Sequence, residues 1–181
     1  MSKPEANVVQ HPTLLDRYMQ LAEEYRESVD AGLTVVRPSD RPEELNDHGF
    51  MRWYLHPELR DAAIRCYNFY VQRIPPGSRT GRQETPGGII FYAWKGRGRT
   101  MIQGTLNAWE TDDLIMLPLL PEGVVFQHFN DDPEQEALLI ACEPNFAESL
   151  GLNRAAVAQQ RELAPEAARR KRRSEGETGG S

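Results

Sequence analysis

One histidine and a few side chains at two-residue spacing are the residues of this chain that could do chemistry. Gln83 and Thr85 lie two positions apart, as do Phe126 and His128. Because side chains alternate between the two faces of a β-strand, each pair would share one face. His128 could then serve as a hydrogen-bonding or acid–base group toward a small acidic or aromatic ligand. The alternative interpretation is a buried histidine that is hydrogen-bonded to a neighbouring strand.

Several arginines surround the first of these pairs. An arginine such as Arg82, if it lies at the mouth of a pocket, could bind a carboxylate through two parallel hydrogen bonds. The alternative interpretation is solvent-facing charge on an edge strand. The arginines of this group are Arg73, Arg79, Arg82, Arg97 and Arg99.

Other catalytic patterns are missing from the sequence. It contains neither a nucleophile elbow nor an HExxH motif. The pair Gly96-x-Gly98 lacks the third glycine and the following helix of a phosphate-binding loop. His48 lies in a Gly/Asp-rich stretch and His56 precedes a proline, so we expect turn or surface positions for both.

Short β-strands are the elements that must position these residues. Between residues 50 and 142 the apolar pattern has a period of two and is interrupted by glycine and proline turns, without the alternating helices of a parallel α/β fold. In residues 64–74, Tyr70, Gln72 and Ile74 share one face, while apolar residues also occupy the other. The predicted strands are 50–55, 64–74, 89–94, 99–103, 106–109, 114–117, 124–129 and 137–142, with a hairpin at Gly104-Thr105.

Both ends of the chain have a different character. Thr13 and Asp16 form a capping-box pattern before a helical apolar repeat, which predicts a helix over 14–30 that ends at Gly32. A second, short helix is predicted over 153–162. We expect residues 1–12 and the basic C-terminal tail, with its run 169–173, to be disordered. The expected organisation is an arm (1–47), a β-domain (48–146) and a C-terminal helix with its tail (147–181).

Composition narrows the range of partners. The chain has 181 residues and a formal net charge of -6, which disfavours a nucleic-acid-binding surface. It has no apolar run long enough to span a membrane. The first ten residues are polar and lack a signal-peptide core. The only two cysteines, Cys66 and Cys142, do not have the number and spacing of a disulfide framework, so we expect a reducing, cytoplasmic environment.

Two motifs carry a resemblance to a known family. The first consists of Gly77, five residues, Gln83, one residue, Thr85, three residues, Ile89, six residues and Gly96. The second consists of Pro121-Glu122-Gly123, two residues, Phe126, three residues and Asn130. With this spacing the stretch 67–144 resembles the cupin superfamily, and in particular small single-domain bacterial cupins. The resemblance implies an all-β fold: a double-sheet, jelly-roll-like β-barrel, here with an N-terminal helix and a short C-terminal helix.

The residues at the metal-binding positions depart from the family. Cupins usually place His, His and Glu where this chain has Gln83, Thr85 and Ile89, and His where it has Phe126. Many relatives bind iron, manganese, nickel or zinc, but a transition metal needs imidazole or carboxylate donors. We therefore expect no cofactor. The alternative is iron or manganese held by an atypical set of Gln83, Glu84 and His128, to which His56 could add. The expected ligand pocket consists of Arg82, Gln83, Thr85, Ile89, Phe126 and His128.

Three functions follow from the resemblance. The first is a non-catalytic cupin, either a companion subunit of a catalytic cupin or a binding protein for a small aromatic or carboxylic ligand, in the catabolism of aromatic or small organic acids. The second is a divergent metal-dependent dioxygenase or lyase that uses His128. The third is a metal-free enzyme with His128 as its base. Under all three we expect a homodimer or hetero-oligomer, with the aromatic run 50–54 at an interface.

Overall fold

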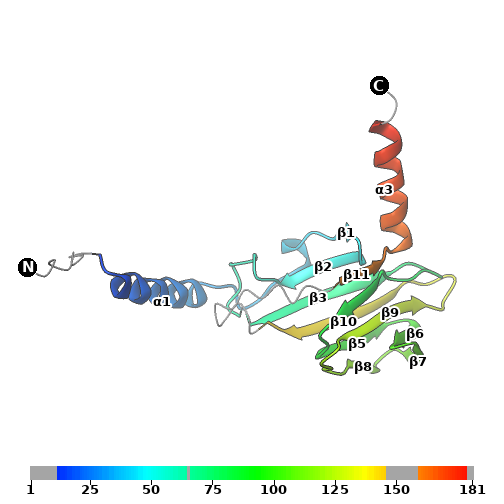
Figure 1. Cartoon of the computed structure of the whole chain (residues 1–181), viewed down its shortest axis with the longest axis horizontal. Coiled ribbons are helices and arrows are strands. Elements are labelled where there is room, and N and C mark those ends of the chain that lie inside the picture. Colours follow the sequence, from blue (N-terminus) through cyan, green and yellow to red (C-terminus); the bar gives the residue numbers. More distant parts are fainter. Residues whose placement is uncertain (1–11, 65, 146–158, 179–181) are drawn as a thin grey trace, which may run out of the picture.

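Two antiparallel β-sheets form the body of the protein, and helix α1 extends away from them at one end (Figure 1). The structure is a computed structural model that describes residues 12–64, 66–145 and 159–178. The first sheet has the strand order β1-β2-β3-β10-β5-β8, and the second has the order β11-β4-β9-β6-β7. This arrangement confirms the predicted all-β, double-sheet architecture.

The strands are short and are joined mostly by tight turns. In the first sheet they are β1 (Glu44–Asn46), β2 (Gly49–Leu55), β3 (Tyr67–Ile74), β10 (Ala137–Pro144), β5 (Ile89–Lys95) and β8 (Leu114–Leu117). In the second they are β11 (Gln159–Glu162), β4 (Arg82–Thr85), β9 (Val124–Asn130), β6 (Arg97–Ile102) and β7 (Thr105–Glu110).

The hydrophobic core lies between the two sheets. Phe91 and Leu139 from the first sheet and Phe126 from the second are each at most 1% exposed. Because the side chains of a strand alternate, every second residue of β3 also enters this core. Those residues include Tyr70 and Gln72, which share one face of the strand as the sequence predicts.

Helix α1 (Leu14–Asp30) has the predicted bounds and the predicted cap. The Thr13 hydroxyl accepts from the Asp16 backbone N–H at 3.1 Å, and the Asp16 carboxylate accepts from the Thr13 N–H at 2.8 Å. The chain then turns at Gly32, where an added Cβ would lie 2.6 Å from the backbone nitrogen of Ala63. The base of α1 is thus seated against the body while the rest projects from it (Figure 1).

Some boundaries differ from the prediction. Strand β3 begins at Tyr67, three residues later than predicted, and Ile64 is about half exposed. The hairpin turn lies at Gln103-Gly104, one residue earlier than predicted, because both residues have the positive φ of a tight primed turn. Strand β1 lies within the predicted N-terminal arm, and the η1 turn (Pro38–Asp40) precedes it.

The C-terminal region also requires a correction. Residues 159–162, predicted as the end of a helix, form strand β11 and pair with β4, while 153–158 lie outside the described residues. Residues of the expected disordered tail form helix α3 (Pro165–Thr178). The start of this helix is held to the body by two buried alanines, Ala164 and Ala167, and by a 2.8 Å hydrogen bond from the Ser78 hydroxyl to Glu166. None of the described helices is long and apolar enough to cross a membrane.

Candidate functional site

Five of the six predicted pocket residues meet inside the barrel. Their side chains point into the space between the sheets, and each residue is at most 5% exposed. They are Gln83, Thr85, Ile89, Phe126 and His128.

Strand register explains why these residues converge. Gln83 on β4 pairs with Phe126 on β9, and two residues further along β9, His128 pairs with Thr100 on β6. Since paired residues share a face of the sheet, the three strands direct these side chains into one interior. Ile89 enters the same core from the first sheet. The predicted face of each strand is therefore confirmed.

His128 is bound on one side of its ring. Its Nδ1 lies 2.7 Å from the Thr100 hydroxyl oxygen, which also accepts a 3.0 Å hydrogen bond from the Trp109 indole N–H. Because the indole can only donate, the Thr100 proton remains available for Nδ1. The Thr80 hydroxyl accepts from the His128 backbone N–H at 3.0 Å. The Thr100 hydroxyl thus holds the ring, Trp109 holds that hydroxyl, and Thr80 holds the backbone of His128.

The other ring nitrogen of His128 has no partner among the residues that the structure describes. Nε2 is buried and makes no hydrogen bond. The rings of Phe91 and Phe126 lie with their centroids 4.5 and 5.4 Å from that of the imidazole. Complete burial lowers the pKa of His128 to about 3, because desolvation penalises the charged ring. The imidazole is therefore neutral near pH 7 and is a weak base there, which argues against His128 as a general base.

Arg82 does not line this interior. It is exposed on the outer face of β4, where its guanidinium binds Glu162 at 2.9 Å. The prediction that Arg82 belongs to the pocket is not supported by this position. The cause is strand alternation, since Arg82 and the buried Gln83 are consecutive residues of one strand and point to opposite faces.

The atypical metal set does not converge either. Glu84 follows Gln83 on β4 and points to the opposite face. His56 lies away from the core, where its Nδ1 accepts from the Glu58 backbone N–H at 3.1 Å. Among the residues that the structure describes, no group of three or more His, Cys, Asp or Glu side chains could hold a metal ion. The amide of Gln83 and one imidazole do not form the donor set that iron or manganese needs.

Two members of the site could not be identified from the sequence alone. Thr100 and Trp109 complete the hydrogen-bonded chain to His128, and both lie in predicted strands. Alternation could have placed them on an inward face, but only the pairing of β6 with β9 and β7 brings them to the histidine. Asn130, the last residue of the second motif, has a structural role: its amide N–H groups donate to the carbonyls of Ile74, Pro75 and Gln135.

Solved structures share this fold, although no protein-family model and no curated protein sequence matches the chain. The polyketide cyclase RemF from Streptomyces resistomycificus aligns with a TM-score of 0.54 and 14% identity, over 75% of this chain and 89% of that one. Vicilin from Capsicum annuum aligns with a TM-score of 0.53 and 17% identity, over 70% of this chain and 34% of that one.

A cupin-like protein from Thermotoga maritima is also similar, with a TM-score of 0.48 and 19% identity over 70% of this chain and 93% of that one. At such identities a structural likeness speaks for the fold and not for the activity. The RemF and Capsicum annuum vicilin structures, both with TM-scores above 0.5, confirm the cupin fold that the sequence motifs imply.

Proposed function

We propose that this chain is a non-catalytic cupin that acts as a companion subunit to a catalytic protein. The observation that carries the proposal is the chemistry of the barrel interior. Where a metal-binding cupin needs imidazole and carboxylate donors, this chain has an amide, a hydroxyl and two hydrocarbon side chains, at Gln83, Thr85, Ile89 and Phe126. The one interior imidazole, His128, is bound at Nδ1 and remains neutral.

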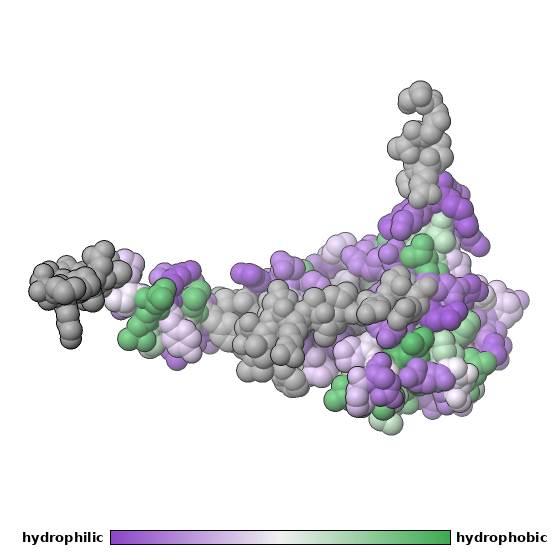
Figure 2. Space-filling view, in the orientation of Figure 1, coloured by the Kyte–Doolittle hydropathy of each residue, from purple (hydrophilic) through white to green (hydrophobic). Residues whose placement is uncertain are grey.

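The surface of α1 supports a role in assembly. Leu14, Leu15 and Tyr18 on this helix are 90%, 68% and 70% exposed, and Figure 2 shows apolar side chains gathered on it. A contiguous apolar surface on a projecting element is typical of a protein–protein contact. The structures of similar fold include one named as a polyketide cyclase, RemF, so the fold alone does not decide between catalysis and assembly.

Metal analysis of the purified full-length chain tests this proposal. We expect well below ~0.1 equivalent of iron, manganese, nickel or zinc per chain after incubation with each ion and desalting, because the described interior offers too few donors. About one equivalent of iron or manganese per chain, together with turnover of an aromatic or small organic acid by the chain alone, would contradict the proposal.

Binding of a small ligand inside the barrel is a second candidate function. Its specific support is Nε2 of His128, which is buried and has no hydrogen-bond partner within the described part of the chain. A ligand oxygen that reached this atom would supply the missing hydrogen bond, and the flanking rings of Phe91 and Phe126 would suit an aromatic body. Titration with aromatic carboxylates while the ¹⁵N signal of the His128 ring is followed tests this candidate. An unchanged signal at saturation would exclude it.

A further inference from the structure

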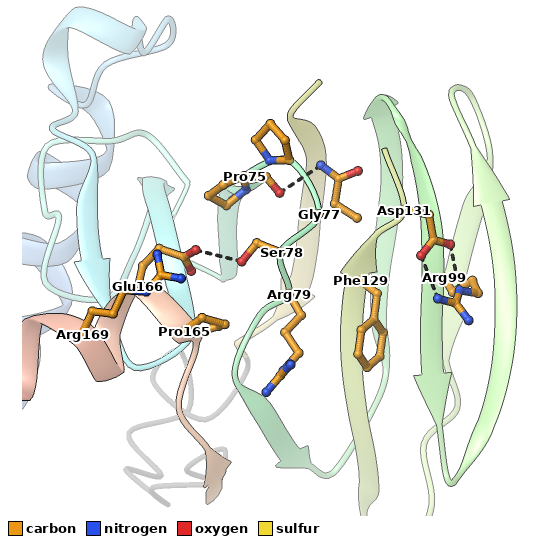
Figure 3. Close-up of a pocket in the computed structure, with 12 residues that line it drawn as sticks. Pro75, Gly77, Ser78, Arg79, Arg99, Phe129, Asp131, Pro165, Glu166 and Arg169 are labelled. Carbon is orange, nitrogen blue, oxygen red and sulfur yellow. Dashed lines mark hydrogen bonds and ion pairs between the residues drawn. The ribbon is translucent and has the colours of Figure 1, made fainter. Parts of the chain in front are cut away.

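A cleft of about 600 Å³ lies outside the barrel, where the second sheet meets the start of α3. Figure 3 shows its side chains arriving from three segments: the turn after β3, the strands β6 and β9, and the first turns of α3. None of these side chains belongs to the interior group around His128. The cleft is therefore separate from the candidate site described above, and what it binds is independent of the proposed function.

The walls of the cleft suit a flat apolar group. Phe129 projects from the outer face of β9, and its ring lies between the side chains of Arg79 and Arg99 in Figure 3. Pro75, Pro76 and Pro165 supply further rigid apolar surface. An aromatic ring set against Phe129 would gain stacking or edge contacts without ordering any flexible apolar side chain.

Two arginines of the cleft are held in place before any ligand arrives. Arg99 binds Asp131 through Nε and Nη2, at 2.7 and 2.8 Å. Arg79 binds Glu162 through one nitrogen at 2.8 Å. Each guanidinium keeps unused N–H groups, because five donors are available in each. Fixing the side chains in advance lowers the entropy lost when an anion binds.

Arg169 gives the cleft more positive than negative charge. The cleft is lined by three guanidinium groups, from Arg79, Arg99 and Arg169, and by two carboxylates, from Asp131 and Glu166. Glu162 lies outside the lining and is shared between Arg79 and Arg82. Arg169 has no ion-pair partner among the described residues, so its charge is not neutralised. One net positive charge matches a monoanion better than a phosphate dianion or a nucleic-acid strand.

We propose that this outer cleft binds an aromatic monocarboxylate. The ring of the ligand lies against Phe129 and the prolines, and its carboxylate accepts hydrogen bonds from Arg169 and from the unused N–H groups of a neighbouring arginine. The start of α3 supplies Pro165, Glu166 and Arg169. The site therefore exists only where the C-terminal segment docks, through β11 on β4 and through the hydrogen bond between Ser78 and Glu166.

Titration of the full-length chain with benzoate by calorimetry tests the proposal. We expect saturable binding with one site per chain, and at least ~tenfold weaker binding in Arg169→Met, which removes a charge-assisted contact. Phe129→Ala should weaken binding by ~fivefold or more. The matched control Arg172→Met, on the same helix but outside the cleft, should change the affinity by less than ~twofold. Benzamide and inorganic phosphate should each bind at least ~tenfold more weakly than benzoate.

Several results would overturn the proposal. No benzoate binding up to ~10 mM would do so, as would an equal loss of affinity in Arg172→Met and Arg169→Met, which would indicate general attraction to a basic helix. Phosphate or benzamide binding as tightly as benzoate would refute the ligand class. If His128→Phe abolished binding while Arg169→Met and Phe129→Ala preserved it, benzoate would occupy the barrel interior, which would support the second candidate function instead.

Discussion

At the scale of single residues, His128 occupies an inward-facing position of the barrel and is packed as part of the core. His128 is 1% exposed and its ring packs against Phe91 and Phe126. One ring nitrogen, Nδ1, is hydrogen-bonded to Thr100. Its pKa is lowered to about 3 by burial, against an ordinary value near 6.5. A histidine of this kind links stability to pH, because the unfolded chain binds a proton that the folded chain rejects.

The sign of this linkage gives the first prediction. Between pH 6.5 and about 3 the unfolded state carries more protons at this residue, so the free energy of unfolding should fall as the pH falls. The contribution of His128 alone is about 1.4 kcal/mol per pH unit, or roughly 5 kcal/mol over the window. Urea denaturation of the wild type and His128→Gln from pH 7 to pH 4 measures it. The variant should be less stable at pH 7, and the difference should narrow below pH 6.5.

The comparison with His128→Gln isolates this effect from the acid titration of the many carboxylates, which both proteins share. The glutamine side chain cannot bind a proton in this range, and its amide can still hydrogen-bond with Thr100. If the two stability curves ran parallel from pH 7 to pH 4, the histidine would not be excluded from protonation in the folded state. The structural account of its burial would then be wrong.

Thr100 provides the second prediction. Its hydroxyl joins the His128 ring to the Trp109 indole, at 2.7 and 3.0 Å, and it is completely buried. Thr100→Val keeps the shape but leaves two buried nitrogens without a partner, and each costs about 1–3 kcal/mol. We expect the free energy of unfolding to fall by roughly 2–5 kcal/mol. Thr100→Ser, which keeps the hydroxyl, should lose less than about 1.5 kcal/mol; an equal loss in both variants would count against the hydrogen-bonded chain.

Much of the interior site could be predicted from residue spacing, but its hydrogen bonds could not. Two-residue spacing places Gln83 and Phe126 inside because alternation is a local property of a strand. The partner of His128 depends on which strand lies beside β9 and in which register, and distant segments of sequence set both. The same local rule, applied strictly, would have placed Arg82 outside, since it adjoins Gln83.

At the scale of elements, the close packing of Gly98 on β6 against its register partner Trp109 on β7 leads to the third prediction. A Cβ added to Gly98 would lie 2.0 Å from the Phe129 carbonyl oxygen and 2.7 Å from the Trp109 ring. Strands β6, β7 and β9 would have to separate to admit a methyl group at this point. Gly98→Ala should therefore lower the free energy of unfolding by roughly 3 kcal/mol or more.

Gly104→Ala is the matched control for this substitution. Gly104 has a positive φ of 83°, but nothing lies within 4 Å of its added Cβ. Its cost should be that of backbone strain alone, about 1 kcal/mol. Thermal and urea denaturation measure both variants. A cost for Gly98→Ala no larger than that for Gly104→Ala would show that the strands are not packed this closely.

The elements differ in how far the sequence alone could define them. Helix α1 was predictable to the residue because the Thr13–Asp16 cap and Gly32 are local signals at its two ends. Strand β11 carries no such signal: its residues, Gln159–Glu162, are all polar. This segment is held as a strand by its pairing with β4 and by Glu162, which binds both Arg79 and Arg82. Helix α3 likewise depends on its docking at Ala164, which a pattern of charged residues does not reveal.

At the scale of the whole molecule, the C-terminal segment packs on the barrel, whereas the N-terminal helix projects from it. The C-terminal segment adds a strand to the second sheet and forms one wall of the outer cleft. The N-terminal segment is seated at Gly32 and then leaves the body as α1 (Figure 1). The first arrangement completes the fold, whereas the second presents a surface that the fold does not cover.

The last prediction concerns that surface. Leu14, Tyr18 and Leu21 recur at helical spacing on one side of α1 and are 90%, 70% and 49% exposed. Burying such side chains against a second protein is worth roughly 1.5 kcal/mol or more each. We therefore expect the purified chain to self-associate at micromolar concentration, and the triple variant Leu14→Gln, Tyr18→Gln, Leu21→Gln to weaken association by at least ~100-fold. Sedimentation velocity over a concentration series measures both.

This experiment tests association without disturbing folding, because the apolar side of α1 packs against neither sheet. The triple variant should keep the midpoint of thermal unfolding of the β-barrel, as exposed substitutions usually change stability by less than about 0.5 kcal/mol. The double variant Gln20→Ala, Glu27→Gln, on the polar side of the same helix, should associate as the wild type does. A wild-type chain that sediments as a clean monomer at ~50 μM would show that α1 does not mediate self-association. The helix would then be left as a contact for a different protein, the companion arrangement proposed above.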